Sequence, residues 1–262
     1  MKQFDSHVHY VGDDKERIKA LVEKSRYKDI FLGYNALNLE TIDFDEHIDA
    51  CRGAFIMPYC IKETDILMEN TRLKKYAESS ARRNLFYFPL VSDQFELFEA
   101  FPNMLGLKEH FYLHNAFQWM QRSKAYSYLN HHHKMLIIHS DDMNRIDFIK
   151  FLTSTYPSMY IQVAHLGCFR RSTTASKLVI DELSPLDNVY FDISTIWDAE
   201  LIAYVYQKCP HKVLFGSDIP YVGKADYFTD YDRIIKEAVA HVEQRNNILY
   251  GNAFSLLSEI MR

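Results

Sequence analysis

The chain has 262 residues, of which 48% are hydrophobic and 25% are charged; this is the profile of a globular protein with its own core and excludes a disordered one. Lys and Arg number 30 against 35 Asp and Glu, so the net charge is −5. The sequence therefore lacks the basic excess that binds nucleic acids or anionic membranes. With only 8 glycines, it also has no GxGxxG or Walker A motif, which argues against a glycine-rich phosphate loop.

Short apolar segments of strand type alternate along the chain with longer segments of helical period. The clearest helical segments, with apolar residues near i, i+3, i+4 and i+7, are residues 116–129, 144–155 and 227–242. Alternating strands and helices form right-handed βαβ units and a parallel sheet. We therefore predict the α/β class, as a (β/α)8 TIM barrel in a single domain spanning residues 1–262. Its candidate strands are residues 2–5, 29–34, 54–59, 85–91, 104–107, 135–138, 160–164, 189–193 and 213–215.

These nine candidates exceed by one the eight strands of a closed barrel. The excess lies early in the chain, where residues 29–34 and 54–59 compete for one place. We favour residues 54–59 as the second barrel strand, which puts residues 29–34 outside the barrel.

The compartment prediction comes from what the sequence lacks. The first residues are polar where a signal peptide needs an apolar run, and no segment approaches the 18 apolar residues of a membrane span. The four cysteines are scattered without a CxxC pair, as expected of reduced thiols in the cytosol. We expect a cytoplasmic protein that binds no membrane and no nucleic acid.

Homodimers are common among such barrels, and nothing in the sequence argues against one.

Polar residues follow several of the predicted strands at their carboxyl ends, where parallel α/β barrels carry their catalytic groups. His7 and His9 follow the first strand, His139 the fifth, His165 the sixth and Asp218 the eighth. His7 and His9 are two residues apart, so on an extended strand both face the barrel mouth. Imidazole and carboxylate groups are ligands of metals such as Zn²⁺. The pattern predicts one divalent metal ion held by His7, His9, His139 and Asp218, with His165 close by.

A second HxH pattern lies at residues 131–133. It follows a helical segment and precedes a strand, so we interpret it as a solvated loop and not as a site.

Seven short motifs occur in one order over nearly the whole chain: DSHVH at 5–9, GLK at 106–108, IIH at 137–139, AHLG at 164–167, VYFDIS at 189–194, LFGSDIP at 214–220 and ILYGNA at 248–253. Together they resemble the amidohydrolase superfamily, in particular the amidohydrolase-2 group of metal-dependent TIM-barrel enzymes. The resemblance implies that His7, His9, His139 and Asp218 hold the metal, and that Asp218 and His165 are catalytic. Zinc is the first choice of metal and manganese the second. The sequence departs from the group at Cys168, where the group often has a second glycine.

The resemblance leaves the reaction open. The leading hypothesis is a hydrolase in which a metal-activated water attacks an ester, lactone or amide bond of a small, carboxylated substrate. The alternative is a metal-dependent, non-oxidative decarboxylase of a small aromatic carboxylic acid. A third hypothesis, from another class, is a non-catalytic barrel that binds a small ligand.

The predicted substrate contacts are Lys108, Arg170 and Tyr221. Lys108 has three interpretations: a surface or structural lysine, a cation that holds an anionic substrate, or a carbamylated bridge between two metal ions. Arg170 is a candidate to receive a carboxylate, and Tyr221 is one of several aromatic residues that could line a pocket. Asp192 is expected either to hydrogen-bond a ligand histidine or to be structural.

Overall fold

The fold is described from a computed structural model of the chain. The structure describes residues 3–12, 15–24, 44–61, 63–82, 84–92, 101–110, 119–139, 145–167, 173–221 and 227–262.

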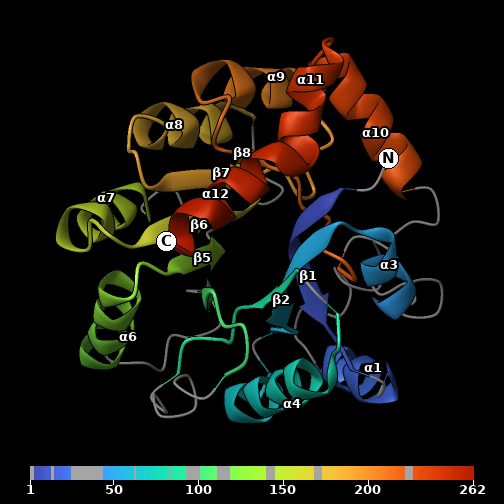
Figure 1. Cartoon of the computed structure of the whole chain (residues 1–262), viewed down its shortest axis with the longest axis vertical. Helices are drawn as coiled ribbons and strands as arrows, with labels where there is room; N and C mark the ends of the chain where they lie inside the picture. The colour runs from blue at the N-terminus through green and yellow to red at the C-terminus, as the bar shows by residue number, and fades with distance from the viewer. Residues whose placement is uncertain are drawn as a thin grey trace.

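In the part of the chain that the structure describes, eight parallel strands form two hydrogen-bonded groups, and they lie at the centre of the molecule with helices around them (Figure 1). Hydrogen-bonded ladders join the first three strands into one group and the last five into another. In chain order the strands are β1 Phe4–Tyr10, β2 Gly53–Pro58, β3 Leu85–Tyr87, β4 Gly106–His110, β5 Met135–His139, β6 Tyr160–Val163, β7 Val189–Asp192 and β8 Val213–Leu214.

Two seams close these groups into a barrel. At the first seam Leu90, just beyond β3, forms a parallel bridge with Lys108 of β4. At the second, Val8 of β1 bridges Ile219, and the His9 amide donates to the Ile219 carbonyl at 2.8 Å. The eight strands thus form the predicted (β/α)8 TIM barrel, with residues 54–59 supplying β2 as expected. Residues 29–34 lie outside the described residues.

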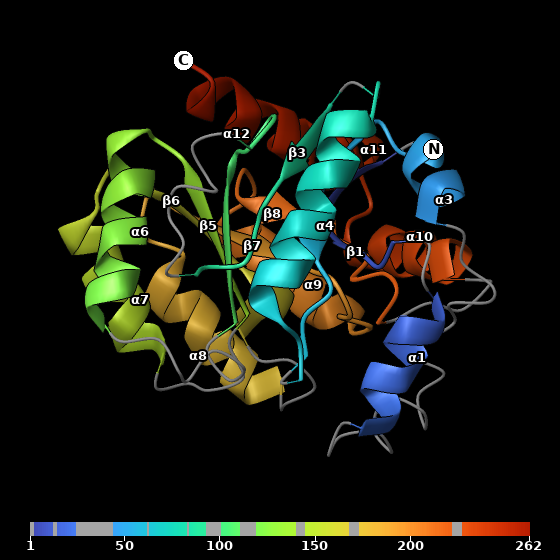
Figure 2. The same ribbon diagram turned by 90° about the horizontal axis from the view of Figure 1, so that it is seen from below.

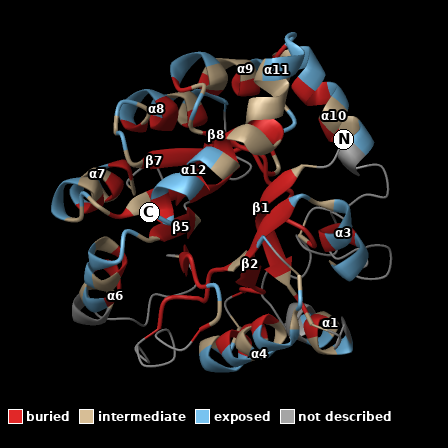
Figure 3. Cartoon of the chain, in the orientation of Figure 1, coloured by how far each residue is buried: buried red, intermediate tan, exposed pale blue. Residues whose placement is uncertain are grey.

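Helices surround the strands and turn their exposed faces outward, while the strands themselves are buried (Figure 3). This burial on both faces explains why the strands appear in the sequence as continuous apolar runs. The described helices are α1 Lys15–Lys24, α3 Phe44–Ala50, α4 Ile66–Ser79, α6 Trp119–His131, α7 Arg145–Thr155, α8 Thr173–Leu183, α9 Ala199–Lys208, α10 Tyr227–Ala238, α11 Val242–Asn246 and α12 Asn252–Ile260, with a short 3-10 turn η1 at Ala164–Gly167 and a π turn η2 at Asn247–Gly251. None of these described helices is long and apolar enough to cross a membrane.

Apolar side chains fill the amino-terminal end of the barrel. Phe4 and Met135, which begin their strands, belong to one buried cluster with Leu256 and Leu257 of α12. Phe4 also contacts the ring of Phe254 edge-on, with centroids 5.5 Å apart. Figure 2 shows α12 lying across this end of the barrel. Because this end is plugged, a small molecule has to approach from the carboxyl ends of the strands.

One helix prediction was wrong at its end. The pattern predicted a single helix over residues 227–242, but α10 ends at Ala238 and α11 begins at Val242. The Arg245 guanidinium donates to the carbonyl oxygens of Val239 and Ala240 at 3.1 and 2.6 Å. These contacts satisfy backbone groups that a continuous helix would have paired internally.

Candidate metal centre

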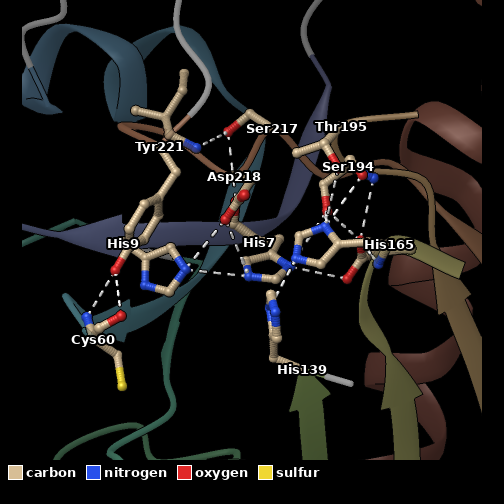
Figure 4. Close-up of polar contacts among 12 residues, drawn as sticks. His7, His9, Cys60, His139, His165, Ser194, Thr195, Ser217, Asp218 and Tyr221 are labelled. Carbon is tan, nitrogen blue, oxygen red and sulfur yellow. Dashed lines mark hydrogen bonds and ion pairs between the residues drawn. The ribbon is translucent and has the colours of Figure 1, made fainter. Parts of the chain in front are cut away.

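The predicted ligands come together at the carboxyl ends of the strands (Figure 4). The Nε2 atoms of His7 and His9 are 3.2 Å apart. Asp218 Oδ1 lies 3.5 Å from His7 Nε2 and 3.3 Å from His9 Nε2. All three side chains are buried, so three metal-ligating atoms from both ends of the sequence meet at one point away from bulk water.

The backbone that presents these ligands is held by one buried carboxylate. Asp5 Oδ1 accepts the amide of His7 at 3.1 Å and the amide of Ser217 at 2.9 Å. The Asp218 amide in turn donates to the His7 carbonyl at 2.8 Å. Asp218 has a φ of +59°, a conformation that costs a non-glycine residue free energy and has to be stabilised by such contacts. Asp5 therefore fixes two ligand-bearing segments relative to each other.

The other ring nitrogens of the two histidines face hydrogen-bond acceptors. His7 Nδ1 lies 3.0 Å from Asp192 Oδ2, and His9 Nδ1 lies 2.8 Å from the Pro58 carbonyl. A carbonyl or carboxylate oxygen can only accept, so each Nδ1 carries the proton and each Nε2 presents a lone pair. Asp192 thus has the first of its two predicted roles, since it hydrogen-bonds a predicted ligand histidine.

This arrangement fits a divalent cation. With both Nδ1 atoms protonated, the Nε2 lone pairs of His7 and His9 and the Asp218 carboxylate are directed at one another at close range, which is unfavourable unless a positive charge lies among them. The Lys108 ammonium, 3.3 Å from His7 Nε2, balances part of the carboxylate charge. Two imidazoles and one carboxylate are also the donor set that Zn²⁺ or Mn²⁺ accepts.

Burial keeps the imidazoles in the neutral form that binds metals. It is the main cause that lowers the pKa of His7 to about 4, and the Lys108 charge adds to it. Burial also lowers the pKa of His9. The pKa of His139 is well below its ordinary value, because burial lowers it and the charges of His165 and Lys108 lower it further. Burial by itself raises the pKa of Asp218, but the neighbouring histidines outweigh it and hold this pKa below its usual range.

His139 and His165 form a second pair beside this cluster. His165 Nε2 is 3.2 Å from His139 Nδ1, and its other nitrogen is 2.8 Å from Ser194 Oγ. The His139 ring stacks on His110, with centroids 3.9 Å apart. The structure therefore places His139 in the site, turned toward His165. Its role as the fourth metal ligand stays a prediction.

The predicted substrate contacts have different surroundings. Lys108 is fully buried on β4, so it is not a surface lysine. The Tyr221 hydroxyl donates to the Cys60 carbonyl at 2.6 Å and accepts its amide at 3.0 Å, while the Tyr221 ring contacts His9 edge-on at 4.7 Å. Tyr221 thus packs against a predicted ligand histidine, and its substrate contact stays a prediction. Arg170 lies outside the described residues.

Sequence reasoning missed His47, whose Nε2 is 2.9 Å from Asp5 Oδ2. His47 lies on α3, far from Asp5 in the sequence, and a single histidine on a short helix gives no signal of this contact. Residues 131–133 are exposed, as predicted, but the loop begins one residue late, because His131 is the last residue of α6 and the turn starts at His132.

No family model matches the chain, and no curated protein matches it. Several solved structures do share its fold. A 5-carboxyvanillate decarboxylase from Sphingomonas paucimobilis has a TM-score of 0.66 at 11% identity, over 98% of this chain and 99% of its own. A probable 2-pyrone-4,6-dicarboxylic acid hydrolase from Acinetobacter baumannii, with citric acid bound, has a TM-score of 0.65 at 15% identity, over 98% of this chain and all of its own. An amidohydrolase from Burkholderia multivorans with bound zinc has a TM-score of 0.52 at 14% identity, over 98% of this chain and 99% of its own. At these identities the similarity shows the fold alone, a (β/α)8 barrel.

Proposed function

We propose that this protein is a metal-dependent hydrolase of the amidohydrolase type. The observation that carries the proposal is the convergence of His7, His9 and Asp218 at the open end of the barrel, with the Nδ1 protons of both histidines directed away from the common point. A site that only filled space would not need two buried imidazoles and a buried carboxylate with their electron pairs directed at one another.

His7, His9 and Asp218 would hold the metal, and His139 is the nearby candidate to complete the set. We favour zinc, because nitrogen-rich sites with one carboxylate suit it and because the Burkholderia amidohydrolase of the same fold contains it. When bound, a divalent ion lowers the pKa of a water molecule and polarises an oxygen of the substrate.

The chain's own residues supply the proton transfers. Asp218 accepts the proton of the attacking water and passes it to the leaving group, since its carboxylate is ionised and faces the reaction centre. His165 is held at Nδ1 by the Ser194 hydroxyl and the Ser194 carbonyl. From Nε2 it would donate a hydrogen bond to the substrate carbonyl when both ring nitrogens carry a proton. Lys108 attracts a carboxylate of the substrate, because a buried ammonium next to the site favours an anion.

The substrate class follows from this charge pattern. We propose a small molecule with at least one carboxylate and an ester, lactone or amide bond. The Acinetobacter hydrolase of the same fold is named for a lactone that carries two carboxylates, which supports this class.

We also propose a reducing compartment, the cytoplasm, because the three cysteines in the described part of the chain, Cys51, Cys60 and Cys209, form no disulfide.

Non-oxidative decarboxylation is the second candidate function, and the likeness to a carboxyvanillate decarboxylase supports it. In that reaction Asp218 or His165 would donate a proton to the carbon that loses carbon dioxide. Product analysis separates the two functions: hydrolysis gives an acid with no loss of carbon, and decarboxylation releases carbon dioxide.

Metal analysis is the first test. We expect about one equivalent of zinc or manganese in untagged protein, and its loss in a His7→Ala, Asp218→Asn double variant. A His131→Ala, His133→Ala variant is the matched control, because it removes two exposed histidines and should keep the metal. Purification on nickel resin has to be avoided, since the histidines at residues 131–133 can retain nickel from the column and distort the metal count. An absence of metal from wild type after loading would refute the metal-dependent mechanism.

A further inference from the structure

A second group of metal-ligating side chains lies outside the barrel, between β1 and α3. Asp5 Oδ2 is 2.9 Å from His47 Nε2, and Cys51 Sγ is 3.8 Å from the same nitrogen. The three ligand atoms all lie within 4.8 Å of one another. Figure 1 shows α3 beside β1, on the outer side of the sheet.

The backbone presents these three atoms together. The other oxygen of Asp5 accepts the amides of His7 and Ser217, which leaves Oδ2 directed at α3. His47 and Cys51 are four residues apart where α3 ends, so both side chains lie on one side of that helix end. No rearrangement of the backbone is needed to bring the carboxylate, the imidazole and the thiol to one point.

The spacing suits a tetrahedral cation. Zinc binds sulfur at about 2.3 Å and nitrogen or oxygen at about 2.0–2.2 Å, so at tetrahedral angles two ligand atoms on the same ion are about 3.3–3.7 Å apart. The two separations at His47 Nε2, 2.9 and 3.8 Å, lie on either side of this range, and all three ligand atoms are within 4.8 Å of one another, so small side-chain rotations bring them to it. Asp5 and His47 are buried and Cys51 is partly exposed, so an ion has an entrance at the thiol and a water can take the fourth position.

We propose that Asp5, His47 and Cys51 form a second metal site, which takes a zinc-type divalent cation with thiolate, imidazole and carboxylate ligands. Binding releases the Cys51 thiol proton to solvent, while the His47 ring proton moves from Nε2 to Nδ1, so that the neutral ring presents the Nε2 lone pair to the ion. The proposal does not rest on the proposed function, because it uses none of the ligands of the active site.

Cobalt provides the test, because a thiolate bound to Co²⁺ gives a near-ultraviolet charge-transfer band that imidazole and carboxylate ligands do not give. The full-length protein is stripped with a chelator and titrated with cobalt chloride, and bound metal is counted by elemental analysis. We expect the band in wild type, and the loss of the band and of about one equivalent of metal in Cys51→Ser. His47→Gln should also lose the band.

Cys60→Ser is the control, because among the described cysteines Cys60 is a buried thiol near the active site that could also supply a sulfur ligand. It should keep the band. Absence of the band from wild type at saturating cobalt, its persistence in Cys51→Ser, or its loss in Cys60→Ser would each overturn the proposal. Circular dichroism of each variant checks that loss of the band does not reflect unfolding, and His47→Gln decides the matter if Cys51→Ser does not fold.

Discussion

Replacing Asp192 by asparagine tests whether the proton on His7 is positioned by its neighbour. The Asp192 carboxylate accepts hydrogen bonds on both oxygens. Oδ2 receives His7 Nδ1 at 3.0 Å and Gln162 Nε2 at 2.7 Å. Oδ1 receives the amides of His165 and Ser194, each at 3.1 Å, and also the Ser194 hydroxyl.

An asparagine has one oxygen for these two sets of donors. The amides of His165 and Ser194 belong to the backbone and cannot rotate away, so the side-chain oxygen of the variant is expected to face them. Its NH₂ group then faces His7 Nδ1, which has to accept instead of donate. This moves the ring proton to His7 Nε2, where it points at His9 and Asp218 and competes with the metal.

The expected loss of metal affinity is about 10- to 100-fold, the usual effect of removing a hydrogen-bond partner of a metal-ligating histidine. This corresponds to about 1.4–2.8 kcal/mol of binding free energy. The measurement is a competition titration against a chromophoric chelator, with thermal unfolding as a check on the fold.

Asp187→Asn is the matched control, because Asp187 is exposed just before β7 and the substitution makes the same chemical change away from the site. Its metal affinity should equal that of wild type. If Asp192→Asn also binds metal within about twofold of wild type, against the larger loss expected, the assignment of the His7 proton is incorrect.

Three further predictions concern the lysine, the packing and the pH response. Lys108→Met should raise the KM for a carboxylated substrate about 10- to 100-fold, since a buried charge partner is worth about 1.5–3 kcal/mol. If the KM stays unchanged, and the activity of wild type depends on bicarbonate while that of the variant does not, Lys108 is carbamylated instead. Gly106→Ala puts a Cβ 1.8 Å from the Met135 carbonyl oxygen. We therefore expect the free energy of unfolding, measured by urea denaturation, to fall by about 3 kcal/mol or more. A variant as stable as wild type would show that β4 can move away from β5. In the metal-free protein, the pKa of His7 is about 4 when folded and about 6.5 when unfolded, so the unfolded chain takes up the proton first as the pH falls. The free energy of unfolding should therefore decrease between about pH 6.5 and 4, by up to about 1.4 kcal/mol per pH unit for this histidine. Equal denaturation midpoints at about pH 7 and pH 5 would contradict this.

The sequence predicted the parts of the site that follow from local position. His7 and His9 could be found because their spacing puts both on one face of an extended strand. The first strand was predicted too short, since β1 runs from Phe4 to Tyr10 and contains both histidines. Asp218 could be found because it follows an apolar run, and the ends of parallel strands meet at one rim. Asp192 could be assigned a role toward a histidine because it ends β7 in the same way. The barrel itself followed from the alternation of strands and helices.

Contacts between distant segments were not predictable in the same way. Nothing near Tyr221 in the sequence indicates that its hydroxyl bonds the backbone of Cys60, 161 residues away. The turn of His139 toward His165 involves His110 at the end of β4, and Ser194, just after β7, holds the other side of the His165 ring. The end of α10 at Ala238 depends on Arg245, which lies beyond the amphipathic pattern from which the helix was predicted.

The seam between β1 and β8 has a consequence for biosynthesis. The hydrogen bond from the Ser217 amide to Asp5 joins positions 212 residues apart, and the predicted metal ligands His7 and Asp218 lie on either side of that seam. A growing chain on the ribosome therefore lacks one side of the metal centre until its eighth strand has emerged. Contacts this distant in sequence form late in folding, because a long loop has to close before they stabilise anything. The protein should thus acquire its ion after synthesis, as a nearly complete barrel.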